Sequence, residues 1–530
     1  MLESLVARTG LARSSTRLAL SMTAAMLVGL CGSIARADDF TNKANKPYTE
    51  VPKAQRSDLV LIPVLMKLDA PTKEVSTLES AMLMPSTSAG AKAASAWASA
   101  KPQQDALKVL ADITKEKDWK KAYAFALPYG IDDVPLEFIQ AGMFIDLGDP
   151  PTLAGAKIQY LPALDHLAIL CHVEATRLAS EGKINDAIDV LTNLLFFSRQ
   201  MADRQFNAEV SWGLSQMRHA CERIRDVVYV DSREGGKIDG AKLKDQIKRF
   251  DDKSNAYLDL GRVRFPEGDR AAAEQLTSRV YTASGTVDQQ VFASTMSRLT
   301  STTHPLRLFS ESGKWRSIGA SQAPRDEAVR QVDGLFSDWA ARWTTPWFDK
   351  RMSNVVQFNR FDKSRFAALG AVVPDMTGLQ YQRHLVRVEL VGTRTALAVA
   401  GYARTIGKIP PQLTAVRPAW LPGIDPDPYN PNTANDAKPP LAFFVPIRDT
   451  AAINGAGNPH EMEIIAGGVP FQVKLQDDVF VLYSVGSDNA KVNAKRVQNT
   501  SDVVQGADYL IWPPVVSLLR QNLLDRGELK

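Results

Sequence analysis

Three amphipathic segments between residues 164 and 228 constrain the fold of this 530-residue chain more than any other feature. In each segment apolar residues recur every three or four positions, which places them on one face of an α-helix. The apolar positions are Leu164, Leu167, Cys171, Ala175 and Leu178, then Ile184, Ala187, Ile188, Leu191, Leu194 and Leu195, and finally Val210, Leu214, Met217, Cys221, Ile224 and Val228. Because short joints separate these segments, including one at Gly182, we expect each helix to pack antiparallel to the next.

The periodicity changes in the last third of the chain. A long helical pattern covers residues 382–406, and Gly407 followed by two prolines should end that helix. Three short β-type runs follow, at residues 441–445, 469–475 and 479–483. The predicted fold class is therefore mainly α, built from helical hairpins or a bundle, with a small C-terminal α+β domain made of the long helix and a short antiparallel sheet.

The first 37 residues have the pattern of a secretory signal peptide. Three arginines precede an apolar run at residues 18–30, and Ala-Arg-Ala at residues 35–37 supplies the small residues that signal peptidases accept. The apolar run of about 13 residues is too short to cross a hydrocarbon core of about 30 Å. We therefore predict cleavage before Asp38. The expected organisation is a signal peptide at 1–37, a mixed region with a linker at 38–150, a helical domain at 151–378 and an α+β domain at 379–530.

The charge balance excludes one class of partner. The whole chain has 63 basic and 59 acidic residues, and the leader holds four arginines and one glutamate, so the remainder has a formal charge of only +1. A nucleic-acid-binding protein needs a strong basic surplus, so we expect no nucleic-acid partner. No later stretch reaches 18 consecutive apolar residues, which predicts no integral membrane segment after cleavage and an extracytoplasmic, periplasmic or envelope location.

The segment from Leu379 to Pro514 carries a family resemblance. Its motifs are GYARTIGKIPPQL after the long helix, then WLPGIDPDPYNP, a strand pair ending in FVLYSVGSD, and SDVVQGADYLIWPP. This segment resembles the globular part of the type II secretion major pseudopilins, and it is similar to a group of uncharacterised exported bacterial proteins with the same tail behind a long helical region. The match covers about 135 residues. Because about 340 residues separate it from the leader, the resemblance does not imply polymerisation through an N-terminal helix.

The resemblance also implies a metal site. The pseudopilin domain commonly holds one calcium ion in the loop after its last strand, and Asp488 and Asp502 fall at the acidic positions of that motif. Calcium takes such oxygen ligands. The loop between them departs from the family pattern because it carries Lys491, Lys495 and Arg496, and these charges are unfavourable beside a cation. No other cofactor is expected.

Motifs of well-marked enzymes do not occur in the chain. We find no nucleophile elbow, P-loop, dinucleotide fingerprint or C-x-x-C pair, and His460-Glu461 lacks the second histidine of a zincin. The mature chain keeps two cysteines, Cys171 and Cys221, which an exported protein can join in one disulfide. Two buried free thiols are the alternative. A metal site formed by the cysteines with the nearby histidines is less favoured, since His166 and His172 lie on different helix faces.

Three further groups of residues have both a functional and a structural interpretation. The acidic and amide residues of a proline-rich loop could bind calcium, and we favour turn formation; they are Asp425, Asp427, Asn430, Asn432 and Asp436. Trp339 and Trp343 could stack on sugars, and we favour a core position. Arg383, Arg387 and Arg394 could recognise an anion, and we favour a solvated helix face.

These patterns favour an exported, non-catalytic binding or scaffold protein of the bacterial cell envelope with a protein partner. The reasons are the missing catalytic motifs and the helical hairpins, which commonly present binding surfaces. Two alternatives stay open. One is an extracytoplasmic hydrolase without a recognisable motif, and the other is a calcium-stabilised assembly module.

Overall fold

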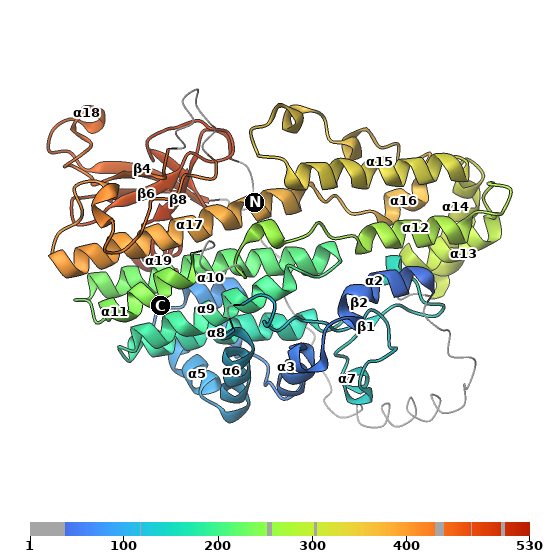
Figure 1. Cartoon of the computed structure of the whole chain (residues 1–530), viewed down its shortest axis with the longest axis horizontal. Helices are drawn as coiled ribbons and strands as arrows, with labels where there is room; N and C mark the ends of the chain where they lie inside the picture. Colours follow the sequence, from blue (N-terminus) through green and yellow to red (C-terminus); the bar gives the residue numbers. More distant parts are fainter. Residues whose placement is uncertain are drawn as a thin grey trace.

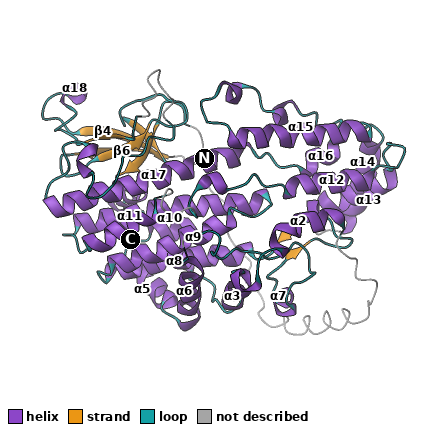
Figure 2. Cartoon of the chain, viewed as in Figure 1, coloured by secondary structure: helices purple, strands orange, loops and turns teal. Residues whose placement is uncertain are grey.

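The computed structural model describes residues 38–116, 118–251, 257–300, 305–429, 439–467, 469–499 and 504–529. The predicted signal peptide and Asp502 lie outside these residues. The described chain is mostly helical, with a sheet at one end beside the helices, as Figures 1 and 2 show. The prediction of a mainly α protein is therefore confirmed.

The three amphipathic segments form the centre of the molecule. They are the helices α8 (Leu161–Ser180), α9 (Ile184–Met201) and α10 (Asn207–Arg233). Gly182 has a φ of 77°, a left-handed conformation that lets the chain turn between the first two helices. The predicted apolar positions are buried, including Leu167, Leu191 and Leu214 at 0% exposure. The helical hairpins follow directly from the period of the apolar residues.

The region before these helices is also helical. Its helices are α2 (Asp39–Thr49), α3 (Asp58–Leu65), α4 (Leu78–Leu83), α5 (Ala89–Ala98), α6 (Lys101–Thr114) and α7 (Leu136–Gln140), followed by the two-stranded sheet of β1 (Ile145–Asp146) and β2 (Lys157–Ile158). The Ser- and Ala-rich stretch at residues 85–102, whose composition suits a linker or a weak helix, contains α5. The Ser88 hydroxyl accepts the N–H of Ala91 at 3.1 Å and caps this helix.

A second group of helices follows α10. It consists of α11 (Gly240–Arg249), α12 (Gly268–Val280), α13 (Gln289–Thr300), α14 (Pro305–Gly319), α15 (Arg325–Thr344), α16 (Ala367–Val372) and α17 (Thr377–Ile406). In Figure 1 helices α12 to α16 lie at the end of the molecule away from the sheet. The long helix α17 ends where the sequence predicts, because Gly407 has a φ of 74°.

The larger sheet has six strands in the order β3-β6-β8-β7-β4-β5. The strands are β3 (Ala442–Phe444), β4 (His460–Ala466), β5 (Val469–Leu475), β6 (Val481–Ser484), β7 (Arg496–Gln498) and β8 (Asp508–Trp512), with the short helix α18 (Ala451–Asn454) between β3 and β4 and α19 (Val515–Asp525) after β8. Strand β7 runs parallel to both neighbours, β4 and β8, while the other pairs are antiparallel.

The prediction of an antiparallel sheet is therefore wrong for β7. This strand has only three residues, Arg-Val-Gln, so it carries no alternating pattern that sequence analysis could detect. In the sheet, β8 lies between β6 and β7. The chain that leaves β6 therefore passes beyond the position of β8, forms β7, and then returns to form β8. The sheet is mixed.

One large hydrophobic core extends through most of these elements, and two smaller clusters lie beside it, one around Phe292 and one around Val516. Helix α17 packs against α10 and α11 and contacts β6 and β8, so it lies between the helical hairpins and the sheet (Figure 1). Buried residues from Ala44 near the start to Leu518 near the end belong to this core. In the part of the chain that the structure describes, no helix is both long enough and apolar enough to cross a membrane.

Candidate functional site

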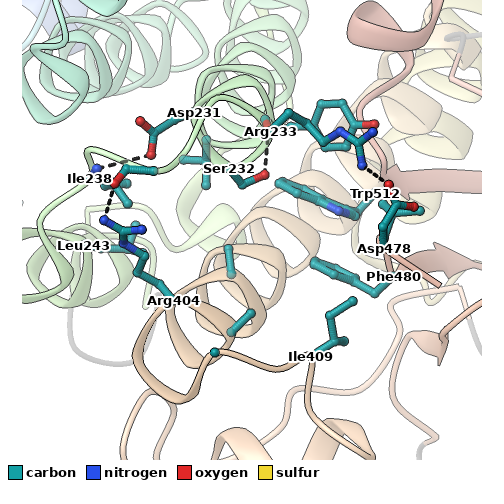
Figure 3. Close-up of a pocket in the computed structure, with 17 residues that line it drawn as sticks. Asp231, Ser232, Arg233, Ile238, Leu243, Arg404, Ile409, Asp478, Phe480 and Trp512 are labelled. Atoms are coloured by element: carbon teal, nitrogen blue, oxygen red, sulfur yellow. Dashed lines mark hydrogen bonds and ion pairs between the residues drawn. The ribbon is translucent and has the colours of Figure 1, made fainter. Parts of the chain in front are cut away.

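A cavity of about 520 Å³ lies where the ends of α10 and α17 meet the sheet (Figure 3). Its walls come from the last turns of α10, the following loop and α11, the last turns of α17, the segment just before β6, and the end of β8. The residues that line it include Val228, Tyr229, Asp231, Arg233, Ile238, Leu243, Ala400, Ala403, Arg404, Ile409, Asp478, Phe480 and Trp512. The cavity is within the range of roughly 300–1,000 Å³ that is typical of small-molecule sites.

Aromatic rings form the wall on the sheet side. Phe480 and Trp512 are stacked, with ring centroids 4.9 Å apart and an interplanar angle of 0°. Tyr229 of α10 meets the Trp512 ring edge-on, with centroids 5.3 Å apart. The rings come together because β6 and β8 are antiparallel neighbours and Trp512 pairs with Leu482. This wall is therefore largely apolar.

The opposite wall is made of small and aliphatic side chains. Ala400 and Ala403 lie on the same face of α17, and their short side chains leave the space that the cavity occupies. Ile238 and Leu243 close the wall from the loop and from α11 (Figure 3). An apolar ligand placed here would contact hydrocarbon on both sides.

The charged side chains at the cavity have identifiable partners. Arg233 forms an ion pair with Asp478, and both side chains are about half exposed, at 50% and 54%. The Asp231 carboxylate accepts the backbone N–H groups of Lys237 at 2.7 Å and Ile238 at 3.2 Å, so it holds the loop after α10. These groups therefore organise the walls of the cavity.

Arg404 is bonded to the backbone alone. Its guanidinium donates to the backbone carbonyls of Gly235, at 3.4 Å, and Gly236. A Cβ atom at Gly236 would lie 2.4 Å from Arg404 Nη1, so only glycine allows this approach. Within the described ranges no carboxylate lies at ion-pair distance from Arg404. It is a cation that can also meet a ligand oxygen.

The described lining has few side chains of the types that act as nucleophiles or bases. Its described lining contains no histidine, cysteine or lysine, and the Ser232 hydroxyl donates to the Tyr229 carbonyl at 2.7 Å. A serine nucleophile needs a neighbouring base, and the partner of the Ser232 hydroxyl is a backbone carbonyl.

The predicted calcium residues lie elsewhere. The Asp488 carboxylate accepts the backbone N–H groups of Ala490 at 3.0 Å and Gly506 at 2.7 Å, so it joins the two ends of the loop. Asp502 is outside the described residues. Among the residues that can be described, no three His, Cys, Asp or Glu side chains gather as a metal site. The buried neighbour Asp508 accepts the N–H of Ala494 at 2.7 Å, and burial raises its pKa to about 6.

Asp427 of the proline-rich loop has the structural role that we favoured. The buried Asp427 carboxylate accepts the Ser484 hydroxyl at 2.7 Å and the N–H groups of Tyr429 and Val485 at 2.9 and 3.1 Å. It fixes the start of the loop to the end of β6. Three other members of this cluster, Asn430, Asn432 and Asp436, lie outside the described ranges.

The disulfide between Cys171 and Cys221 is not formed in the structure. Both thiols are free and fully buried, on α8 and α10, and burial raises the pKa of each. The nearby His172 is also fully buried, and burial lowers its pKa to about 3. These side chains fill the core.

Two arginines of α17 are buried, so the predicted solvated face is wrong for them. Arg383 donates to the Trp343 carbonyl at 2.7 Å and to the Leu260 carbonyl at 2.9 Å. Arg394 forms an ion pair with Asp251 at 3.1 Å and another with Asp425. They are buried because further segments cover this helix face. Trp343 and Trp339 are in the core, as we favoured.

Sequence analysis missed the cavity itself. Tyr229, Arg404, Phe480 and Trp512 lie in four separate segments. The last three fall within the motifs that resemble the pseudopilin domain, but nothing in those motifs indicates that the residues meet at a cavity. Comparisons of the chain with protein-family models, with curated proteins and with solved structures gave no match.

Proposed function

We propose that this chain is an exported, non-catalytic binding protein of the bacterial cell envelope, and that the cavity beside the sheet binds an uncharged, largely apolar molecule. The observation that carries the proposal is the stacked pair of Phe480 and Trp512 on one wall of a cavity of about 520 Å³. Apolar pockets with few polar groups are the usual form of a small-molecule site.

The chemistry of the lining indicates the kind of ligand. The aromatic wall and the alanine wall favour a flat hydrocarbon body, because its burial removes apolar surface from water on both faces. Arg404 lies at the polar end of the cavity and can donate to one oxygen acceptor. The ligand in this proposal is a flat apolar molecule with an acceptor oxygen at one end.

The lining supports binding rather than hydrolysis. Asp231 is held by two backbone N–H groups, and Asp478 is paired with Arg233 at the exposed rim. A hydrolase would need a carboxylate or another base aimed at the substrate. The hydrolase and the calcium-stabilised module stay predictions, and a melting curve with and without chelator tests the second of them.

Two further elements belong to this proposal. Residues 1–37 direct export, and residues 379–530 form a pseudopilin-like unit that contacts an envelope protein. The arginine-rich, apolar leader supports export, and the motifs after the long helix support the second element. Mass spectrometry of the native protein should find Asp38 at the amino terminus, and an intact Met1 would contradict export with cleavage.

A neutral fluorescent probe tests the cavity. N-phenyl-1-naphthylamine is apolar, and its emission rises when it leaves water. We expect saturable binding to the mature chain and at least about tenfold weaker binding to Ala403→Phe, whose ring fills the cavity. Ala341→Phe adds the same ring on the exposed face of α15 and serves as the matched control.

Two results would contradict the proposal. Absence of saturable binding at micromolar probe would show that the cavity does not accept apolar molecules. Equal binding to Ala403→Phe and to the unmodified chain would show that the probe binds elsewhere. Circular dichroism of each variant shows whether its helices are intact.

A further inference from the structure

A second cavity, of about 450 Å³, lies away from the sheet, between the end of α2, the end of α9 and the segments at 119–125 and 257–265. In Figure 1 helix α2 and the sheet are in opposite halves of the molecule. This cavity shares no lining residue with the one beside the sheet. Its lining is dominated by arginine and aromatic side chains.

Two of the arginines are buried and incompletely bonded. Arg204 is 1% exposed, and its Nε donates to Glu209 at 2.7 Å while Nη1 donates to the Phe125 carbonyl at 3.3 Å. Its Nη2 atom is buried without a hydrogen-bond partner. Arg199 is 2% exposed and pairs with Asp203 at 2.6 Å, while its Nε atom is likewise buried without a hydrogen bond. Buried donors of this kind are stabilised by an acceptor.

Two more arginines line the cavity from an exposed position. Arg262 lies over the Trp119 ring, with its guanidinium carbon 4.1 Å from the ring centroid, and Arg264 is exposed. Neither has a carboxylate at ion-pair distance in the described ranges. An unpaired guanidinium beside an aromatic face can bind an oxyanion on one side and contact a ring on the other.

The charge balance of the cavity is positive. The four guanidinium groups face two carboxylates, those of Asp203 and Glu209, so two positive charges are left. A third carboxylate, that of Asp259, accepts the N–H of Gly261 at 2.8 Å. It interacts electrostatically with both Arg199 and the buried Arg383, so it does not make the net charge of the cavity negative. A neutral or cationic ligand would leave these charges without a partner.

Aromatic side chains complete the lining. Tyr48, Tyr123, Trp119 and Phe265 contribute rings to the cavity. Trp119 is 44% exposed, which is unusual for a side chain of this size. Such rings stack on flat or sugar rings, while the arginines hold the attached charge.

We propose that this cavity binds a small organic anion in which a phosphate or another dianionic oxyanion is attached to a ring. The arginines bind the oxyanion and Trp119 contacts the ring. The site differs in ligand chemistry from the apolar cavity and does not depend on it.

Calorimetric titration of the mature chain with phenyl phosphate tests this site. The double variant R262Q/R264Q removes the two exposed charges, and we expect at least about tenfold weaker binding. R316Q/R330Q is the matched control, because it removes two exposed arginines of α14 and α15 and changes the net charge equally. The control should bind like the unmodified chain.

Three comparisons decide the outcome. Phenyl phosphate should bind more tightly than inorganic phosphate, and Trp119→Ala should remove that difference while it leaves inorganic phosphate binding unchanged. Benzyl alcohol, which has the ring without the charge, should not bind here. Absence of phenyl phosphate binding up to millimolar concentration, or equal losses in the two double variants, would overturn the proposal.

The two sites are distinguishable. R262Q/R264Q should leave the binding of N-phenyl-1-naphthylamine unchanged, and Ala403→Phe should leave the binding of phenyl phosphate unchanged. Loss of phenyl phosphate binding in Ala403→Phe would place the anion in the apolar cavity and contradict the second site.

Discussion

The buried ion pair between Arg225 of α10 and Glu389 of α17 offers the sharpest test of how the centre of the molecule is held together. Both side chains are 0% exposed. Arg225 also donates to the Thr393 hydroxyl at 2.6 Å, and Glu389 accepts the Tyr509 hydroxyl at 2.6 Å. The Nε and Nη2 atoms of Arg225 are buried without a hydrogen bond. The pair therefore joins two helices and the sheet but is incompletely satisfied.

The expected magnitudes follow from this geometry. Removal of one partner, by Arg225→Met or Glu389→Leu, leaves a buried charge alone and should lower the free energy of unfolding by about 3–5 kcal/mol. Replacement of both partners removes both charges. It leaves the hydroxyls of Thr393 and Tyr509 without this partner, at about 1 kcal/mol each, so we expect the double variant within about 2 kcal/mol of the unmodified protein.

Urea denaturation followed by circular dichroism measures these free energies. The coupling energy of the double-mutant cycle should be at least about 4 kcal/mol. If the double variant lost as much stability as the two single variants together, the coupling energy would be zero. The two charges would then not stabilise each other, which would refute the expectation.

Three other predictions concern packing, ionisation and reactivity. Gly401→Ala should lower the free energy of unfolding by about 1–3 kcal/mol, because its Cβ would lie 2.2 Å from the Trp420 ring. Gly313→Ala adds a Cβ atom that has nothing within 4 Å in an exposed helix. It should raise the free energy of unfolding by about 0.5–1 kcal/mol in the same urea titration. Equal effects of the two substitutions would refute the steric explanation. Burial raises the pKa of Asp269 to about 7 from 3.8, so the folded protein keeps a proton that the unfolded chain releases between these values. The free energy of unfolding should therefore fall as pH rises from about 4 to 7, by at most about 4 kcal/mol. Asp269→Asn should lack this part of the pH dependence. An unchanged pH dependence in this variant would contradict the raised pKa of Asp269. Both described cysteines should resist iodoacetamide in the native protein and react in denaturant, because burial keeps them as inaccessible thiols; native labelling would contradict this.

The periodic pattern of helix α10 predicted one of its two buried faces. Its apolar residues, such as Leu214 and Ile224, are at the predicted positions on the buried face. The polar face of the same helix is buried as well: Glu222, Arg225 and Asp226 are all at most 4% exposed. An amphipathic pattern predicts water on that side, and only the partners brought by α17, β8 and α19 make burial of these charges tolerable.

The strands near the end of the chain were predicted only in part. Residues 469–475 were predicted as a β-run and form β5, because they have strand-forming residues in a continuous run. Strands β4, β7 and β8 were not predicted. Strand β7 takes its conformation from the neighbours on both sides, and a three-residue strand has no stability of its own.

Local patterns in the amino-acid order were enough to determine the helical hairpins, the turn at Gly182 and the end of α17 at Gly407, because each depends on residues within a few positions of one another. The tertiary structure alone decided where Phe480 meets Trp512, which arginines are buried, and that four guanidinium groups share one cavity. Those features depend on contacts between segments up to hundreds of residues apart. Contacts at that separation are set by the packing of the whole chain, and no short stretch of sequence encodes them.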